Sequence, residues 1–121
     1  MEIARDELST KLSRHDDLKL VMAASDFGFR MKHIPGSLNF RTANQMLAAL
    51  GKDDDIVVYC SNADCHASLA AIQKLRDGGF ARVRHYRGGI IDWEAAGLPL
   101  EGEWAGESAE TATSPKSSSS T

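Results

Sequence analysis

Two cysteines and a histidine lie close together in the middle of the chain, at Cys60, Cys65 and His66. A cysteine thiolate is a nucleophile that can carry sulfur, and a neighbouring histidine can hold or move a proton near neutral pH. The residues between the two cysteines are small or polar: Ser61, Asn62, Ala63 and Asp64. The spacing predicts a nucleophilic site whose working atom is the thiol of Cys60.

The segments on either side of this loop determine where the thiol lies. Residues 56–59 (Ile-Val-Val-Tyr) form an apolar run typical of a central parallel strand, and a helix is predicted from about His66 to Asp77. In an open α/β sheet, binding sites form at the carboxyl ends of the strands. Backbone N–H groups and a helix dipole at that point favour an anion, such as a thiolate or a persulfide. The simpler interpretation is that Cys60 is a small buried hydrophobic residue.

The rest of the chain alternates between strand and helix patterns. We predict a helix over 4–14, a strand over 18–24, a helical turn or loop over 26–32, a strand over 37–40, a helix from Thr42 to Leu50, a strand over 83–86 and a helix over 89–96. This order predicts an α/β domain with a mainly parallel sheet and helices on both faces.

Length and composition indicate one globular domain. The chain has 121 residues, of which 42% are hydrophobic and 26% charged. We expect the domain to span residues 1–104. Residues 105–121 contain no large aliphatic or aromatic side chain, so we predict a disordered tail there.

Charge and hydropathy narrow the possible partners and location. The net charge of -3 argues against a nucleic-acid surface, although Arg82, Arg84, His85 and Arg87 form a local basic patch. No apolar run is long enough for a membrane span, and the N-terminus lacks the features of a signal peptide. We therefore expect a cytoplasmic protein with reduced cysteines. The sequence leaves the oligomeric state open.

Three segments, in order, carry a resemblance to a known family. They are His-Ile-Pro-Gly-Ser-Leu-Asn at 33–39, the strand and loop at 56–68, and the glycine-rich segments at 78–99. Together they resemble the rhodanese-like domains, with a match from residue 3 to about 102. The resemblance implies a parallel sheet of about five strands, Cys60 as the catalytic cysteine, residues 61–66 as the active-site loop, and transfer of sulfane sulfur through a Cys60 persulfide.

The partners implied by the resemblance are a small sulfur donor and a thiol or protein acceptor, with no cofactor. We predict no metal site, because Cys60, Cys65 and His66 lack a paired Cys-x-x-Cys spacing and an obvious fourth ligand. Phosphatase chemistry is disfavoured as well. It requires an arginine at the sixth position after the cysteine, and His66 occupies that position.

The chain also departs from the family pattern. Met22 and Ala24 stand where the family usually has Asp-x-Arg, and Lys32 replaces the usual glycine. Cys65 stands where many thiosulfate-using members have an arginine, whose planar donors would bind the oxyanion. We therefore expect thiosulfate to be a poor donor. The departures keep open a second function, a catalytically weak or inactive module for binding or redox sensing.

Several neighbouring residues have two possible roles. Cys65 could attack a sulfur-loaded Cys60 as a resolving thiol, or it could simply begin the helix. Arg87 could add positive potential near Cys60, or it could be an ordinary surface residue. We expect His66 to be solvated and His33 to be a hydrogen-bonded structural residue. The predicted roles of the remaining residues are a tight turn at Gly88 and Gly89 and packing by Trp93.

Overall fold

The structure is a computed structural model that describes residues 2–61 and 66–103. Nine elements follow one another in these residues. They are α1 (Arg5–Ser13), β1 (Leu18–Met22), α2 (Asp26–Met31), β2 (Ser37–Leu38), α3 (Ala43–Ala49), β3 (Asp55–Tyr59), α4 (Ala67–Asp77), β4 (Val83–Tyr86) and α5 (Gly89–Ala95). The predicted α/β alternation is confirmed.

The strands form one parallel sheet in the order β2-β1-β3-β4. Its two central strands, β1 and β3, pair along their whole lengths, from Leu18 opposite Asp55 to Met22 opposite Tyr59. Parallel strands are usually covered on both faces, which explains their continuous apolar sequences. All four carboxyl ends lie at one edge of the sheet, and Cys60 follows β3 at that edge.

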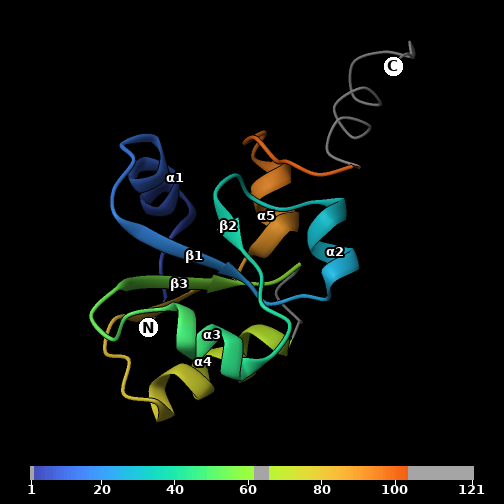
Figure 1. The fold of residues 1–121 in the computed structure, drawn as a ribbon. Helices are drawn as coiled ribbons and strands as arrows, with labels where there is room; N and C mark the ends of the chain where they lie inside the picture. The colour runs from blue at the N-terminus through green and yellow to red at the C-terminus, as the bar shows by residue number, and fades with distance from the viewer. Residues whose placement is uncertain (1, 62–65, 104–121) are drawn as a thin grey trace.

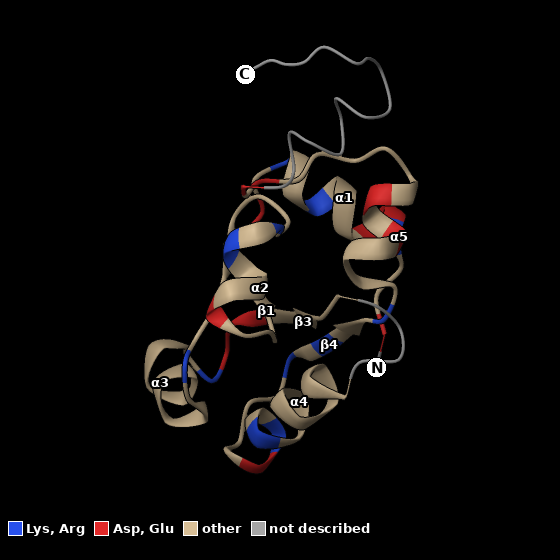
Figure 2. Cartoon of the chain, turned by 90° about the vertical axis from the view of Figure 1, so that its right-hand side faces the viewer, with Lys and Arg blue, Asp and Glu red and all other residues tan. Residues whose placement is uncertain are grey.

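Helices cover both faces of the sheet (Figure 1). Helices α1, α2 and α5 lie over one face, and their apolar side chains pack with Leu20, Val57 and Tyr59. Helices α3 and α4 lie over the other face and pack with Val21 and Val58. Figure 2 shows the same three layers from the side. Because alternate strand residues point to opposite faces, each strand contributes to both cores.

Three strand predictions need correction. The predicted strand over 18–24 ends at Met22. The predicted strand over 37–40 ends at Leu38, because the side chain of Asn39 turns back to bond with the end of β1. The expected sheet of about five strands has four. At the outer edge of β4 the chain supplies one parallel bridge, Glu2 to His85, with Ile3 N–H donating to the His85 carbonyl. A single bridge partly covers that edge without forming a fifth strand.

The helix boundaries follow the predicted signals closely. The Thr42 hydroxyl accepts a hydrogen bond from Gln45 N–H and thereby caps α3, as the sequence predicted. Ser25 caps α2 in the same way, which makes the ambiguous segment 26–32 a helix. Gly97 follows α5 with a φ of 77°, a left-handed conformation that ends helices. The predicted tail at 105–121 lies outside the described residues.

No helix in the described part of the chain is both long enough and apolar enough to cross a membrane.

Candidate active site

Cys60 lies at the carboxyl end of β3, almost fully buried, with an exposed fraction of 4%. The strand alternation places Ile56 and Val58 on the α3/α4 face, so the Cys60 side chain points to that face as well. Its Sγ lies 3.1 Å from the carbonyl oxygen of Ala23, the residue after β1. In this structure the Cys60 sulfur is disulfide-bonded, so the expectation of a reduced cysteine is not met at this position. Cys60 therefore lies at the sheet edge where α/β proteins form their sites.

Tyr59, the residue before the cysteine, links the end of β3 to a neighbouring turn through its hydroxyl group. Tyr59 is completely buried, and its hydroxyl accepts a hydrogen bond from Ile34 N–H at 2.9 Å. The same oxygen lies 2.7 Å from Ser37 Oγ, and Ser37 Oγ donates to the Ile34 carbonyl at 2.6 Å. These bonds join β3 to the turn at 33–37 that carries part of the family resemblance. Burial raises the pKa of Tyr59 to about 12, against the lowering effect of its two hydrogen bonds.

Asn39 holds the neighbouring strand end in place. Its Nδ2 donates to the Met22 carbonyl at 3.0 Å and to the Ala24 carbonyl at 2.9 Å. These two carbonyls flank Ala23, whose own carbonyl contacts the Cys60 sulfur. Backbone Ala23 N–H also donates to the Tyr59 carbonyl at 2.8 Å. Asn39 therefore positions the backbone against which the sulfur rests.

The start of α5 holds the backbone of the cysteine itself. Ile90 N–H donates to the Cys60 carbonyl at 3.1 Å, and Ile91 N–H donates to the Ser61 carbonyl at 3.0 Å. Gly89 makes this approach possible, with a φ of 64°. A Cβ at this position would lie 2.2 Å from the Cys60 carbonyl oxygen. The turn predicted at Gly88 and Gly89 is confirmed, and its role is close backbone contact with the candidate nucleophile.

The roles of Tyr59 and Asn39 were not foreseen from the sequence. Tyr59 was predicted only as the last residue of a strand, and Asn39 only as part of the family-like turn. The hydrogen-bond partners of the Tyr59 hydroxyl come from a different part of the chain, so no local sequence pattern predicts them. The available signal was an asparagine three residues after Gly36 of the Pro-Gly turn, because side-chain amides near turns often bond to backbone.

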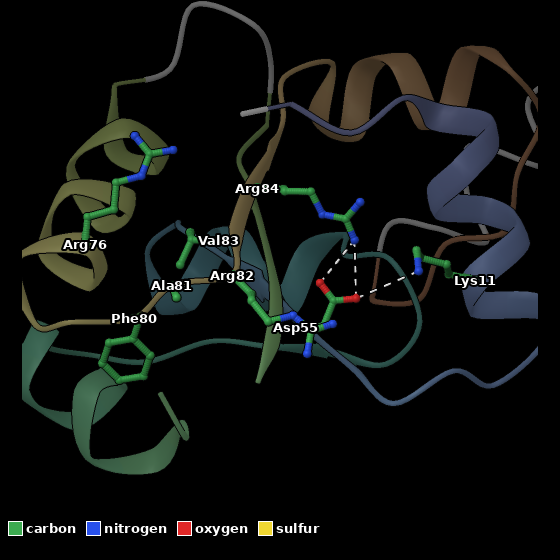
Figure 3. A pocket seen from close by; sticks show the side chains of 8 residues that line it. All are labelled: Lys11, Asp55, Arg76, Phe80, Ala81, Arg82, Val83 and Arg84. Carbon is green, nitrogen blue, oxygen red and sulfur yellow. Dashed lines mark hydrogen bonds and ion pairs between the residues drawn. The ribbon is translucent and has the colours of Figure 1, made fainter. Parts of the chain in front are cut away.

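The residues of the predicted basic patch do not lie together in the structure, because they are placed at different ends and on different faces of the sheet. Arg82 and Arg84 lie at the amino ends of the strands, beside a cavity of about 580 Å³ (Figure 3). Arg84 bonds to Asp55 at 3.1 Å and to Glu7 at 3.1 Å, and Lys11 lies 3.9 Å from Asp55. This end of the sheet is opposite to the Cys60 end, so these arginines play no part in the candidate site.

His85 lies on the α4 side of the sheet, where its Nε2 is 3.0 Å from Ser68 Oγ. Ser68 is buried in the first turn of α4, so this contact joins that turn to β4. Burial lowers the pKa of His85, Glu2 raises it and Arg87 lowers it further. The ring is therefore favoured in its neutral form, and His85 adds little positive charge to the protein.

The remaining candidates have clear positions. His33 is a hydrogen-bonded structural residue, as predicted, because its Nδ1 lies 2.8 Å from the Phe29 carbonyl and its ring stacks on Phe29. Trp93 is buried in the core, and its indole N–H donates to the Pro99 carbonyl at 2.9 Å. Arg87 follows β4 at the Cys60 end of the sheet, where it lines a pocket with the N-terminal segment. Its electrostatic role stays a prediction.

Part of the predicted active-site loop lies outside the described residues, namely Asn62, Ala63, Asp64 and Cys65. The backbone cradle and the resolving role of Cys65 therefore stay predictions. Ser61 and His66 are described, and both are exposed. His66 occupies the N-cap position of α4 without a side-chain capping bond, which agrees with the solvated role expected for it.

The raised pKa of Tyr59 predicts a loss of stability in alkali. Below about pH 10 the phenol is protonated in both the folded and the unfolded chain. Between about pH 10 and about pH 12, only the unfolded chain releases this proton, so the free energy of unfolding should fall by about 3 kcal/mol.

Urea unfolding at about pH 9 and about pH 11 measures the first half of this loss, about 1.4 kcal/mol, with Tyr59→Phe as the comparison. The variant should be less stable by about 1–3 kcal/mol near neutral pH, because Ile34 N–H loses its acceptor. It should then lose less stability than the parent in alkali. The pKa of Tyr86 is raised as well, by burial and by Asp92, but that contribution is common to both proteins. Equal alkaline losses in the two proteins would contradict the prediction.

Comparisons with known proteins agree with this geometry. The rhodanese-like domain family matches residues 4–96. A sulfurtransferase of Allochromatium vinosum is 32% identical over 101 residues, which is 82% of this chain and 92% of that protein. The HTH-type transcriptional regulator Rv0324 of Mycobacterium tuberculosis is 37% identical over 75 residues, which is 60% of this chain. The match spans about a third (33%) of the length of that regulator.

Solved structures share the fold. The protein BH2092 of Bacillus halodurans superimposes with a TM-score of 0.77 at 24% identity, covering 84% of this chain and 76% of that one. The human single-domain sulfurtransferase TSTD1 superimposes with a TM-score of 0.66 at 21% identity, covering 78% of this chain and 95% of that one. The parallel sheet, the buried cysteine at its carboxyl edge and the match over most of the domain have one explanation. This chain belongs to the rhodanese-like domain family.

Proposed function

We propose that the protein is a sulfurtransferase that carries sulfane sulfur as a persulfide on Cys60. The observation that supports this most is the position of Cys60, at the carboxyl end of β3 with its own carbonyl and that of Ser61 held by α5. A nucleophile needs such a fixed backbone to meet a donor in a reproducible geometry. The relative named a sulfurtransferase, which this chain matches over most of its length, supports the same reaction class.

The reaction has two balanced steps. The Cys60 thiolate attacks the outer sulfur of a persulfide donor RSS⁻, the S–S bond of the donor breaks, and RS⁻ leaves with the electron pair. An acceptor thiolate then attacks the outer sulfur of the Cys60 persulfide, which restores the Cys60 thiolate. Because the Cys60 sulfur is disulfide-bonded in this structure, two molecules of a thiol such as glutathione must first reduce that bond by thiol–disulfide exchange and leave as their own disulfide.

Intact-mass and peptide mass spectrometry test the proposal directly. We expect reduced protein exposed to glutathione persulfide to gain the mass of one sulfur atom, located on Cys60 and lost again when excess thiol is added. Cys60→Ser should gain none. No added sulfur on Cys60 with this donor, with hydrogen polysulfide or with thiosulfate would refute the proposal. Thiosulfate is expected to be the poorest of the three.

Cys65→Ser separates a persulfide carrier from a resolving pair. If Cys65 resolves the persulfide, its thiolate attacks the inner sulfur of the Cys60 persulfide, and hydrosulfide leaves as a disulfide forms. The Cys65→Ser variant would then hold its persulfide longer than the parent and release less hydrosulfide. Equal lifetimes would assign Cys65 no part in the release of sulfur.

A binding or redox-sensing module is the second candidate, favoured by two observations. The Cys60 sulfur is disulfide-bonded here, and it lies against a carbonyl oxygen, a partner that does not stabilise a thiolate. The match to part of a transcriptional regulator is compatible with such a module. A chain that cycles between oxidised and reduced forms with glutathione, but never acquires sulfur on Cys60, would support this function over transfer.

A further inference from the structure

An apolar groove lies beside the candidate nucleophile, on the α3/α4 face of the sheet. Its volume is about 350 Å³. It is lined by the end of β1 and the residues that follow, by the start of α3 and by one side of α4. These lining residues include Ala23, Phe40, Arg41, Met46, Ala70 and Lys74. Most of the lining is apolar, and alanines on α4 leave the space open.

The groove and the Cys60 sulfur share one wall. Ala23 lines the groove, and its carbonyl oxygen lies 3.1 Å from Cys60 Sγ. Strand alternation directs the Cys60 side chain to the same face of the sheet as Val58, the face that α3 and α4 cover. Cys60 itself does not line the groove, so a molecule lying there would reach the sulfur past Ala23, the residue that contacts both.

The charge on the lining restricts the kind of molecule that fits. Arg41 and Lys74 are exposed on the groove, and neither forms an ion pair within residues 2–61 and 66–103. Arg41 lies beyond the end of β2, at the same edge of the sheet as Cys60. Cys65 stands where many thiosulfate-using members of the family have an arginine. Arg41 can offer a positive charge from the groove side instead.

We propose that this groove binds the apolar body of an anionic sulfane-sulfur donor and presents its terminal sulfur to Cys60. The inference rests on the proposed function and adds a substrate class to it. Thiosulfate has no apolar body, so it would gain nothing from the groove. A donor with an apolar group next to its sulfur-bearing anion would bury that group against Phe40 and the α4 alanines.

Thiosulfonate anions are suitable probes, because they differ only in this apolar group. In each of them the Cys60 thiolate attacks the outer sulfur of RSO₂S⁻, the S–S bond breaks, and the sulfinate RSO₂⁻ leaves with the electron pair. We expect kcat/KM for benzenethiosulfonate to exceed that for methanethiosulfonate by about tenfold. Each value is first divided by the rate constant for the reaction of the same donor with free glutathione. This corrects for the difference in intrinsic reactivity between the two donors.

Two matched pairs of variants locate the effect. Ala70→Phe should fill the groove and bring the ratio of the two donors close to one. Leu69→Phe, at an exposed position on the same helix but outside the groove, should keep the ratio. Arg41→Gln should lower kcat/KM for both thiosulfonates by about two- to fivefold. Arg76→Gln, which removes a cation from α4 that does not line the groove, should not.

The outcomes distinguish the groove from the transfer reaction. If both thiosulfonates load Cys60 equally well, or if Ala70→Phe leaves their ratio unchanged, the groove proposal is wrong and the transfer proposal stands. If no donor loads Cys60, the transfer proposal is wrong. The groove is then tested alone, by titrating Cys60→Ser with benzenesulfinate and following amide NMR shifts at Phe40, Thr42 and Ala70. An absence of shifts there would overturn the groove proposal as well.

Discussion

Gly89→Ala is expected to lower the free energy of unfolding by about 3–5 kcal/mol and to remove most of the sulfur loading at Cys60. Two costs add at this position. The left-handed φ of 64° is unfavourable for alanine, and the new Cβ would lie 2.2 Å from the Cys60 carbonyl oxygen. Backbone cannot give way as a flexible side chain can, so the start of α5 and the Cys60 backbone must move apart.

Gly97→Ala is the matched control for this prediction. Gly97 also has a left-handed φ, 77°, but nothing lies within 4 Å of the position where its Cβ would be. This variant should lose only about 1–2 kcal/mol and should load sulfur normally. Urea unfolding and mass spectrometry on both variants give the comparison. If the two variants lost equal stability, the contact between Gly89 and Cys60 would not be what requires a glycine there.

Asn39→Asp is expected to be the second most damaging change, costing about 2–4 kcal/mol near neutral pH. The substitution keeps the shape of the side chain but replaces a double donor with an acceptor. The carbonyls of Met22 and Ala24 would lose their partner and face a carboxylate instead. Because Ala23 lies between them and contacts the Cys60 sulfur, loading of Cys60 should slow as well.

The pH dependence gives this variant a distinctive signature. Two facing carbonyl oxygens raise the pKa of a carboxyl group, because its protonated form can donate a hydrogen bond and its anion is repelled. The stability lost at neutral pH should therefore return in part as the pH falls towards about 4. Asn44→Asp, an exposed position in α3, is the control and should change stability little. A loss at Asn39 that does not vary with pH would argue against this hydrogen-bond account.

The elements that carry strong local patterns could be predicted from the sequence. The β-branched run before Cys60 predicted a strand that begins one residue later than β3 does. The predicted bounds of β4 agree with the observed ones. Thr42 predicted the start of α3, and Gly97 predicted the end of α5. Both predictions were possible because capping residues act on their immediate neighbours. The position of Cys60 at the end of a central strand followed from the same patterns.

The contacts that hold the site could not be predicted in this way, because they join distant segments. The strand predicted to reach Phe40 stops at Leu38, since Asn39 bonds to β1 rather than extending β2. The edge of β4 is covered by one bridge from Glu2, too short to leave a strand pattern. A pair of glycines predicts a turn, but the sequence does not show that this turn packs closely against the Cys60 carbonyl.

The bonds from Ile90 and Ile91 to the Cys60 and Ser61 carbonyls also bear on when the site forms during synthesis. The cysteine leaves the ribosome well before the residues that anchor its backbone. Domains fold as units once their distant partners are available, so the carbonyls of Cys60 and Ser61 gain these partners only after β4 and the start of α5 have been made. A nascent chain therefore carries its cysteine in an unorganised segment, and an ordered sulfur site is a property of the finished domain.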